Sequence, residues 1–296
     1  MILPEGRRLS FAEFGRANGR PVFWFHGTPG ACRQIPNAAR QAALERDIRL
    51  IGVDRPGAGT STPHLYDRIL DWATDFAFVA DRLEIDRCAV VGLSGGGPYA
   101  LACCAALPGR IAAAAVLGGV APTMGPEATG GGVVGRTAVL HPLVSTLRTP
   151  LSFGFATFVW GLRPFVSQAF ELYARISPEG DRRVFARPDM KEMFLDDILT
   201  GSKPGLRAPV FDLLLFWRPW GFSLRDVRVP THFWHGDSDN IVPLAHGQHM
   251  ASLVQNAAVT IRPGESHLGG FAAAEEVLEV LFEMWDGGRP VVGVPA

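Results

Sequence analysis

The hydrophobic positions of this 296-residue chain fall into short runs separated by longer amphipathic stretches. Several short runs are apolar at consecutive positions, which is typical of strands covered on both faces. They predict strands at 9–14, 21–25, 49–53, 88–93, 112–117, 231–234 and 258–261, the first two forming an early strand pair. The helical spacing between them predicts helices at 36–46, 70–83, 98–107, 244–253 and 272–285. This α/β alternation implies a mainly parallel twisted sheet with helices on both faces.

The alternation stops between about residues 120 and 226. This block begins with glycines and prolines and continues with aromatic residues, many of them at helical spacing: Phe153, Phe155, Phe158, Trp160, Phe165, Phe170, Phe211, Phe216, Trp217 and Trp220. We expect an α/β core domain of residues 1–120 and 227–296, and a helical cap (lid) insertion of residues 121–226. Most of these aromatic side chains should form the core of the cap. Some should face the ligand cleft, which lies at the carboxyl edge of such sheets.

Charge and hydropathy narrow the class of partners. The chain has 28 Lys and Arg against 29 Asp and Glu, a formal net charge of −1. This balance argues against a nucleic-acid partner, which requires a basic face, and against a polybasic membrane anchor. The longest uncharged stretches, 111–126 and 149–162, are too short for a membrane span. We therefore expect a small-molecule substrate, and the sequence is compatible with a homodimer.

Four cysteines, Cys32, Cys88, Cys103 and Cys104, lack metal-ligand spacing. Two of them are adjacent in an alanine-rich predicted helix, where small buried thiols are the usual finding. A chain of this size needs no disulfide scaffold, and its N-terminus lacks the apolar stretch of a signal peptide. The sequence therefore predicts a cytoplasmic protein.

The first candidate for chemistry is Gly-Leu-Ser-Gly-Gly at 92–96, directly after the apolar residues 88–91 and before a predicted helix. A G-x-S-x-G pattern at such a junction places Ser94 on a turn so tight that only glycines, among them Gly92, fit beside it. A serine hydroxyl is a poor nucleophile at neutral pH. It needs a base to accept its proton and an acid to orient that base.

Two later loops supply the base and the acid. One follows the predicted strand 231–234 and contains Asp237 and Asp239; the other follows 258–261 and contains His267. Both loops should lie at the same sheet edge as Ser94, which gives the chain order Ser94, Asp239, His267. Asp237 is the rival acid, although a position further into the loop turns more freely towards the base.

Together these patterns resemble those of Ser-dependent, esterase-like members of the α/β-hydrolase superfamily with a helical cap. The motifs that carry the resemblance are His26-Gly27-Thr28-Pro29-Gly30, Asp54-Arg55-Pro56-Gly57-Ala58-Gly59, Gly92-Leu93-Ser94-Gly95-Gly96, His235-Gly236-x-x-Asp239-x-x-Val242-Pro243 and Gly264-x-x-His267. The likeness covers nearly everything outside the insertion and implies the α/β-hydrolase fold. The spacing of the fourth motif selects Asp239 as the acid.

Acyl transfer also needs fixed donors for the negative charge that develops on the carbonyl oxygen. Gly95, directly after the nucleophile, gives one backbone N–H by position, aided by the helix N-terminus. The resemblance implies that Thr28 gives the second donor of this oxyanion hole. His26 and Gly27 are expected to support that loop, with His26 bracing it through hydrogen bonds instead of acting as a base. The 54–57 motif is expected to be a structural turn.

Two departures from related enzymes limit the chemistry. The nucleophile is a serine and not an aspartate, which disfavours epoxide opening and halide displacement through an alkyl-enzyme ester. No acidic residue occurs within 118–124, an alternative acid position in some relatives. The sequence contains no nucleotide-phosphate loop, flavin signature or metal-ligand cluster, so we predict neither cofactor nor metal.

We therefore expect an enzyme that cleaves an uncharged, fairly apolar carboxylic ester through an acyl-enzyme. The apolar preference follows from an aromatic-rich insertion with no marked excess of one charge. A C–C bond hydrolase, a lactonase, a thioesterase, a prolyl aminopeptidase and a cofactor-free haloperoxidase remain alternatives on the same triad. The aminopeptidase would need insertion carboxylates such as Glu171, Asp196 or Asp197. A small-molecule receptor without turnover is the alternative from another class.

Overall fold

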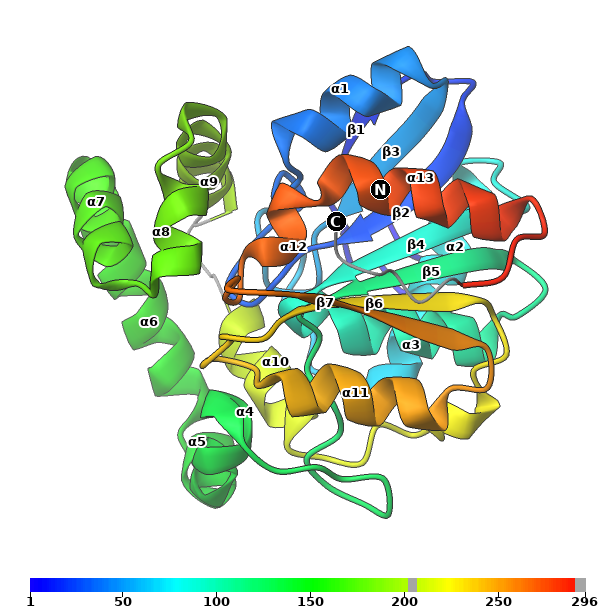
Figure 1. Ribbon diagram of the computed structural model, residues 1–296. Helices are drawn as coiled ribbons and strands as arrows, with labels where there is room; N and C mark the ends of the chain where they lie inside the picture. The colour runs from blue at the N-terminus through cyan, green and yellow to red at the C-terminus, as the bar shows by residue number, and fades with distance from the viewer. Residues whose placement is uncertain (202–206, 291–296) are drawn as a thin grey trace.

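The computed structural model describes residues 1–201 and 207–290, and its strands form one seven-stranded sheet (Figure 1). The strands are β1 (Phe11–Gly15), β2 (Arg20–Phe25), β3 (Ile48–Val53), β4 (Cys88–Leu93), β5 (Ile111–Leu117), β6 (Thr231–Gly236) and β7 (Ala257–Arg262). They lie in the order β1-β3-β2-β4-β5-β6-β7, and only the β1–β3 pair is antiparallel. The prediction of a mainly parallel sheet is confirmed.

Helices cover both faces of this sheet (Figure 1). One face carries α1 (Asn37–Glu45) and α13 (Ala274–Trp285), with the short α12 (Gly269–Ala272) at its end; the other carries α2 (Trp72–Arg82), α3 (Gly97–Ala106) and α11 (Leu244–Leu253). Successive strand residues alternate between the two apolar clusters: Val22 and Trp24 pack with α1 and α13, while Phe23 and Phe25 pack with α2 and α3. Burial on both faces is why the strands are apolar at consecutive positions.

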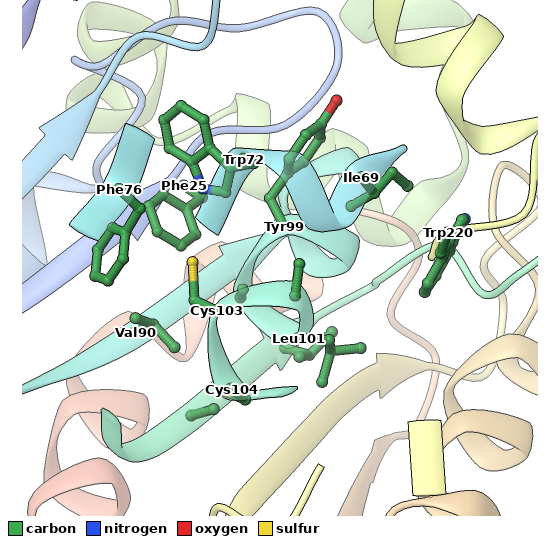
Figure 2. Packing of buried hydrophobic residues seen from close by; sticks show 14 of the residues in the cluster. Phe25, Ile69, Trp72, Phe76, Val90, Tyr99, Leu101, Cys103, Cys104 and Trp220 are labelled. Carbon is green, nitrogen blue, oxygen red and sulfur yellow. The ribbon is translucent and has the colours of Figure 1, made fainter. Parts of the chain in front are cut away.

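The second of these clusters surrounds helix α3 (Figure 2). Phe25 meets Trp72 and Phe76 edge to face, with ring centroids 5.7 Å apart in both pairs. Cys103 and Cys104 are completely buried here, and all four cysteines of the chain are buried and free. This packing fixes the helix that begins directly behind Ser94.

The predicted early strand pair is wrong in one respect. Strands β1 and β2 follow one another in the chain but do not pair, because β3 lies between them. Burial explains the order. β2 and β3 are apolar enough to take interior positions, whereas β1 is only partly buried and carries the exposed Glu13, which pairs with Arg49. A half-polar strand is suited to the sheet edge.

Seven α-helices of the described residues lie between β5 and β6: α4 (Gly132–Thr137), α5 (His141–Thr146), α6 (Arg148–Leu162), α7 (Val166–Ile176), α8 (Glu179–Phe185), α9 (Pro188–Gly201) and α10 (Ala208–Phe216). Helices α4 to α9, here called the lateral helices, stand to one side of the sheet (Figure 1). Helix α10 contributes Leu214, Leu215 and Phe216 to the apolar cluster around α3. On the other face of the sheet, Val184 of α8 and Met190 and Met193 of α9 join the cluster that packs with α1 and α13.

The expectation that most aromatic residues of this segment form its own core needs correction. Four of the ten, Phe153, Phe158, Trp160 and Phe165, are 74%, 63%, 59% and 60% exposed, and three more, Phe216, Trp217 and Trp220, are buried in the cluster around α3. Phe153, Phe158 and Trp160 lie on α6, so one face of this helix is exposed to solvent. Within 1–201 and 207–290, no helix combines the length and the hydropathy that crossing a bilayer requires.

Candidate active site

Ser94 occupies the turn between β4 and α3 with a φ of +48°. This left-handed conformation is unfavourable for a residue with a side chain, so its surroundings must hold it. The turn also requires glycine on both sides. A Cβ on Gly92 would lie 2.7 Å from the Gly96 carbonyl oxygen, and a Cβ on Gly96 would overlap the carbonyl oxygen of Phe25. The Ser94 side chain lines a cavity at this edge of the sheet.

Three loops that are distant in sequence bring Ser94, His267 and Asp239 together. His267 Nε2 lies 2.9 Å from Ser94 Oγ, and His267 Nδ1 lies 2.7 Å from Asp239 Oδ2. With its proton on Nδ1, the imidazole donates to the carboxylate and accepts from the hydroxyl. The rival acid Asp237 is exposed, and its Oδ1 accepts from the Gly264 amide at 2.9 Å.

The surroundings of Asp239 keep it ionised. Burial raises its pKa, but hydrogen bonds from His235, His267 and the Val242 amide outweigh burial and hold the pKa well below its ordinary value. Its Oδ1 accepts from the amides of Ile241 and Val242 at 2.9 and 2.8 Å. The loop after β6 therefore presents a fixed carboxylate to the imidazole.

The same carboxylate acts on His267. Burial lowers the pKa of the imidazole, but the hydrogen bond and charge of Asp239 outweigh burial, and the pKa is raised overall. Asp181 of α8 adds to this rise, and its Oδ1 accepts from the Leu268 amide at 2.8 Å. Asp181 belongs to no motif and was not predicted. Proximity to the base appears only after folding.

The two predicted oxyanion donors lie next to each other. A Cβ on Gly95 would overlap Thr28 Oγ1, so the loop after β2 approaches the nucleophile turn at this residue. The Thr28 hydroxyl donates to Asp212 Oδ2 at 2.5 Å and accepts from Arg55 Nη2 at 3.0 Å. Gly27 N donates to Gln34 Oε1 at 2.7 Å. Side chains therefore hold this loop at several points.

His26 lies behind the loop and does not face Ser94. Its Nδ1 is 2.8 Å from the Gly27 carbonyl oxygen, and its Nε2 accepts from the Arg55 amide at 3.2 Å. Burial, reinforced by the Arg55 charge, holds the pKa of this imidazole well below its ordinary value. These contacts are those expected of a bracing residue; the bracing role itself stays a prediction.

Arg55 and Asp212 form a buried ion pair that was not predicted, with Nη2 and Oδ2 2.7 Å apart. Arg55 is 1% exposed and Asp212 is 3% exposed. The two residues are 157 positions apart, so no local spacing could join them. One signal was available, since Asp212 is the only charged residue in the apolar helix α10.

The cavity beside Ser94 and His267 measures about 500 Å³. The sheet loops contribute one side, including residues 27–30 and Gln34. The helical segment contributes the other, through Phe155, Val159, Leu162, Val166, Ala169, Phe170, Tyr173, Phe185, Phe194, Asp197, Ile198 and Gly201. As expected, some aromatic side chains of this segment face the cleft. Among the described residues, no three His, Cys, Asp or Glu side chains gather as a metal site would require.

Comparisons with known proteins agree with this architecture. The chain matches the model of the alpha/beta hydrolase fold over residues 20–273. It is similar to a non-heme haloperoxidase of Rhodococcus erythropolis, with 27% identity over 89% of this chain and 90% of that protein. It is also similar to a 2-hydroxy-6-oxo-2,4-heptadienoate hydrolase of Pseudomonas putida, with 24% identity over 91% and 87%. Among solved structures, a thermophilic esterase from Thermogutta terrifontis superposes with a TM-score of 0.68 at 19% identity, covering 96% of each chain.

The chain therefore belongs to the α/β-hydrolase fold family. It is an enzyme of that family, and its substrate is a small molecule. The fold class predicted from the sequence is confirmed.

Proposed function

We propose that this enzyme is a serine hydrolase that cleaves an uncharged, fairly apolar carboxylic ester through an acyl-enzyme. The observation that carries the proposal is the hydrogen-bonded series from Ser94 through His267 to Asp239, which opens on an apolar cavity. Nucleophile, base and orienting acid in this order are the parts that acyl transfer requires.

In the first half of the reaction, Ser94 Oγ attacks the ester carbonyl carbon while His267 Nε2 accepts the hydroxyl proton. The carbonyl oxygen becomes an oxyanion, and the backbone N–H groups of Gly95 and Thr28 are its proposed donors. Asp239 stabilises the imidazolium that forms. Collapse of the tetrahedral intermediate breaks the bond to the alcohol, which leaves with the proton from Nε2.

In the second half, water attacks the acyl-enzyme. His267 Nε2 accepts a proton from the water as its oxygen bonds to the acyl carbon. The second tetrahedral intermediate collapses, the carboxylic acid leaves, and Ser94 Oγ recovers its proton from Nε2. The raised pKa of His267 suits this role, because a general base works best when its pKa lies near the working pH.

The cavity wall supports the preference for an uncharged substrate. Its described lining residues include aromatic and aliphatic side chains from α6 to α9 and no Lys or Arg. One carboxyl group, Asp197, also lines the cavity, but burial holds its pKa well above the ordinary value, which favours its neutral form over one that would attract a cationic amine. A substrate carboxylate would therefore enter the cavity without a basic side chain to pair with, which is unfavourable. A cavity of about 500 Å³ falls within the range of small-molecule sites.

We further propose that residues 121–226 form the cap of this enzyme, over a core of residues 1–120 and 227–296. The cavity wall from α6 to α9 supports a role in selecting the substrate. The burial of α10 in the cluster around α3 supports a firm attachment of the cap's last helix to the core.

The direct test is Ser94→Ala assayed with 4-nitrophenyl esters of increasing acyl length. We expect kcat/KM to fall by roughly 10⁴-fold or more, because loss of the nucleophile leaves only binding and oxyanion stabilisation. Ser252→Ala, at an exposed serine of α11, is the matched control and should retain parental activity. Parental turnover by Ser94→Ala would contradict the proposal.

A further inference from the structure

Asp212 is the only charged residue of α10, and its surroundings in that helix are apolar. A buried carboxylate is costly unless charged or hydrogen-bonding groups compensate it. Both oxygens of Asp212 are used. Oδ1 accepts from Tyr99 Oη at 2.7 Å and Arg55 Nε at 3.2 Å, and Oδ2 accepts from Arg55 Nη2 at 2.7 Å and Thr28 Oγ1 at 2.5 Å. One carboxylate therefore joins α10 to α3 and to the loop after β2.

Arg55 extends this connection to the backbone before Thr28. Its Nη1 donates to the His26 carbonyl oxygen at 2.6 Å, and its Nη2 donates to the Gly27 carbonyl oxygen at 3.0 Å. Because His26 Nε2 accepts from the Arg55 amide, the neutral imidazole carries its proton on Nδ1 and donates it to the same Gly27 oxygen. Two side chains therefore hold this one carbonyl group.

The orientation of that carbonyl determines where a proposed oxyanion donor points. The C=O of Gly27 and the N–H of Thr28 belong to one planar trans peptide group, so they point in opposite directions. Fixing the Gly27 oxygen therefore fixes the direction of the Thr28 N–H. Hydrogen-bond strength falls steeply when donor and acceptor are misaligned, and oxyanion stabilisation depends on donors aimed in advance.

We propose that Asp212 is a positioning residue, which holds Arg55 and Thr28 so that the Thr28 N–H is aimed at the substrate oxyanion. The inference rests on the proposed function. It makes the geometry of the oxyanion hole depend on the place of α10, a helix of the segment between β5 and β6. This alignment stabilises the substrate in its ground state little, whereas it stabilises the negatively charged tetrahedral intermediate strongly.

The test compares the Asp212→Asn variant with the parental enzyme in two measurements: the kinetics of ester hydrolysis and the affinity for an alkyl boronic acid. The adduct of the boronic acid with Ser94 carries an oxygen at the oxyanion position. We expect kcat and boronate affinity to fall in parallel by roughly 10- to 100-fold, somewhat less than the loss of a whole donor. KM and the affinity for an uncharged apolar alcohol should change by less than about threefold, because binding in the ground state does not depend on the direction of the Thr28 N–H.

The chain offers a matched control in Asp75, which is also buried, also paired with an arginine (Arg7, at 2.7 and 2.8 Å) and also bonded to a tyrosine (Tyr66). These partners belong to neither the loop of Thr28 nor the contacts of Arg55, to which Asp212 bonds. Asp75→Asn should reduce stability while leaving kcat and boronate affinity near the parental values. If Asp212→Asn does not fold, Thr28→Val removes the Asp212–Thr28 bond without leaving Arg55 unpaired, and should lower both quantities by several-fold.

The outcomes separate the two proposals. Parental enzyme that turns over no ester and binds no boronate would contradict the proposed function. The inference alone would be overturned if the parental enzyme turns over ester and binds boronate, and a folded Asp212→Asn or Thr28→Val variant binds boronate with parental affinity. Equal losses in alcohol and boronate affinity would also overturn it, since they would indicate a general collapse of the cavity.

Discussion

The sheet-edge loops and the lateral helices face the same cavity but differ in how tightly they are held. The loops place Ser94, His267 and Asp239 within hydrogen-bonding distance, and buried side chains hold them from behind. The lateral helices contribute apolar wall on one face and leave large aromatic side chains such as Phe153 exposed on the other. Under the proposed function, this difference predicts that the reaction depends on the loops and the choice of substrate on the helices. Changes in the loops should alter kcat, and changes in the helices should alter which ester is preferred.

The largest effect is expected from the base. His267→Gln should lower kcat by roughly 10⁵-fold, because the variant has no group to accept the Ser94 proton. His249→Gln is the matched control, since His249 lies on α11 and bonds to the Glu127 carbonyl oxygen. Steady-state kinetics with one 4-nitrophenyl ester would measure both variants. A His267→Gln enzyme within tenfold of the parent would break the assignment of chemistry to the loops.

The next largest effect is expected from the acid, Asp239, and is measured as a change in the pH dependence of kcat/KM. Protonated His267 cannot accept a proton, so kcat/KM should fall as pH drops through its raised pKa. Asp239→Asn removes the main cause of that rise, so the acid limb should move to lower pH while kcat falls by roughly 10³-fold or more. Asp237→Asn should leave both the limb and kcat near parental values. A limb that stays in place in Asp239→Asn would contradict the coupling of the two side chains.

The smallest effect is a change of preference and should come from the lateral helices. Val159→Trp of α6 narrows the cavity, and we expect kcat/KM for an octanoate ester to fall by roughly 10- to 100-fold while that for an acetate ester changes by less than about threefold. Trp160→Ala changes the exposed neighbouring residue on the same helix and should leave kcat/KM unchanged for both esters. Equal losses on both esters in Val159→Trp would contradict the separation of reaction and selection.

Sequence reasoning and structure agree best where motif and backbone geometry coincide. A G-x-S-x-G turn specifies its own conformation, so Ser94 and Gly92 could be located without any long-range contact. The loops after the last two strands could be aligned with it because parallel strands end at one edge of a sheet. The strand order near β1 was harder, because it depends on which strands are buried, a global property.

The features that sequence reasoning missed are contacts between distant elements. Arg55 was expected to belong to a structural turn, yet it pairs with Asp212 of a helix 157 residues later. Asp181, which lies on α8, raises the pKa of His267, although no sequence spacing relates the two residues. The prediction that the aromatic residues of α6 would be buried was wrong for a similar reason. Hydrophobic spacing indicates a helix, but it does not say how many layers cover that helix.

The central claim is that Ser94 is a nucleophile activated by His267, and covalent labelling tests it most directly. A fluorophosphonate probe followed by peptide mass spectrometry should modify one residue per chain, Ser94. The Ser94→Ala variant should take up no label, and His267→Gln should be labelled far more slowly than the parent. Absence of labelling in the folded parental enzyme, or modification at a different residue, would contradict the account.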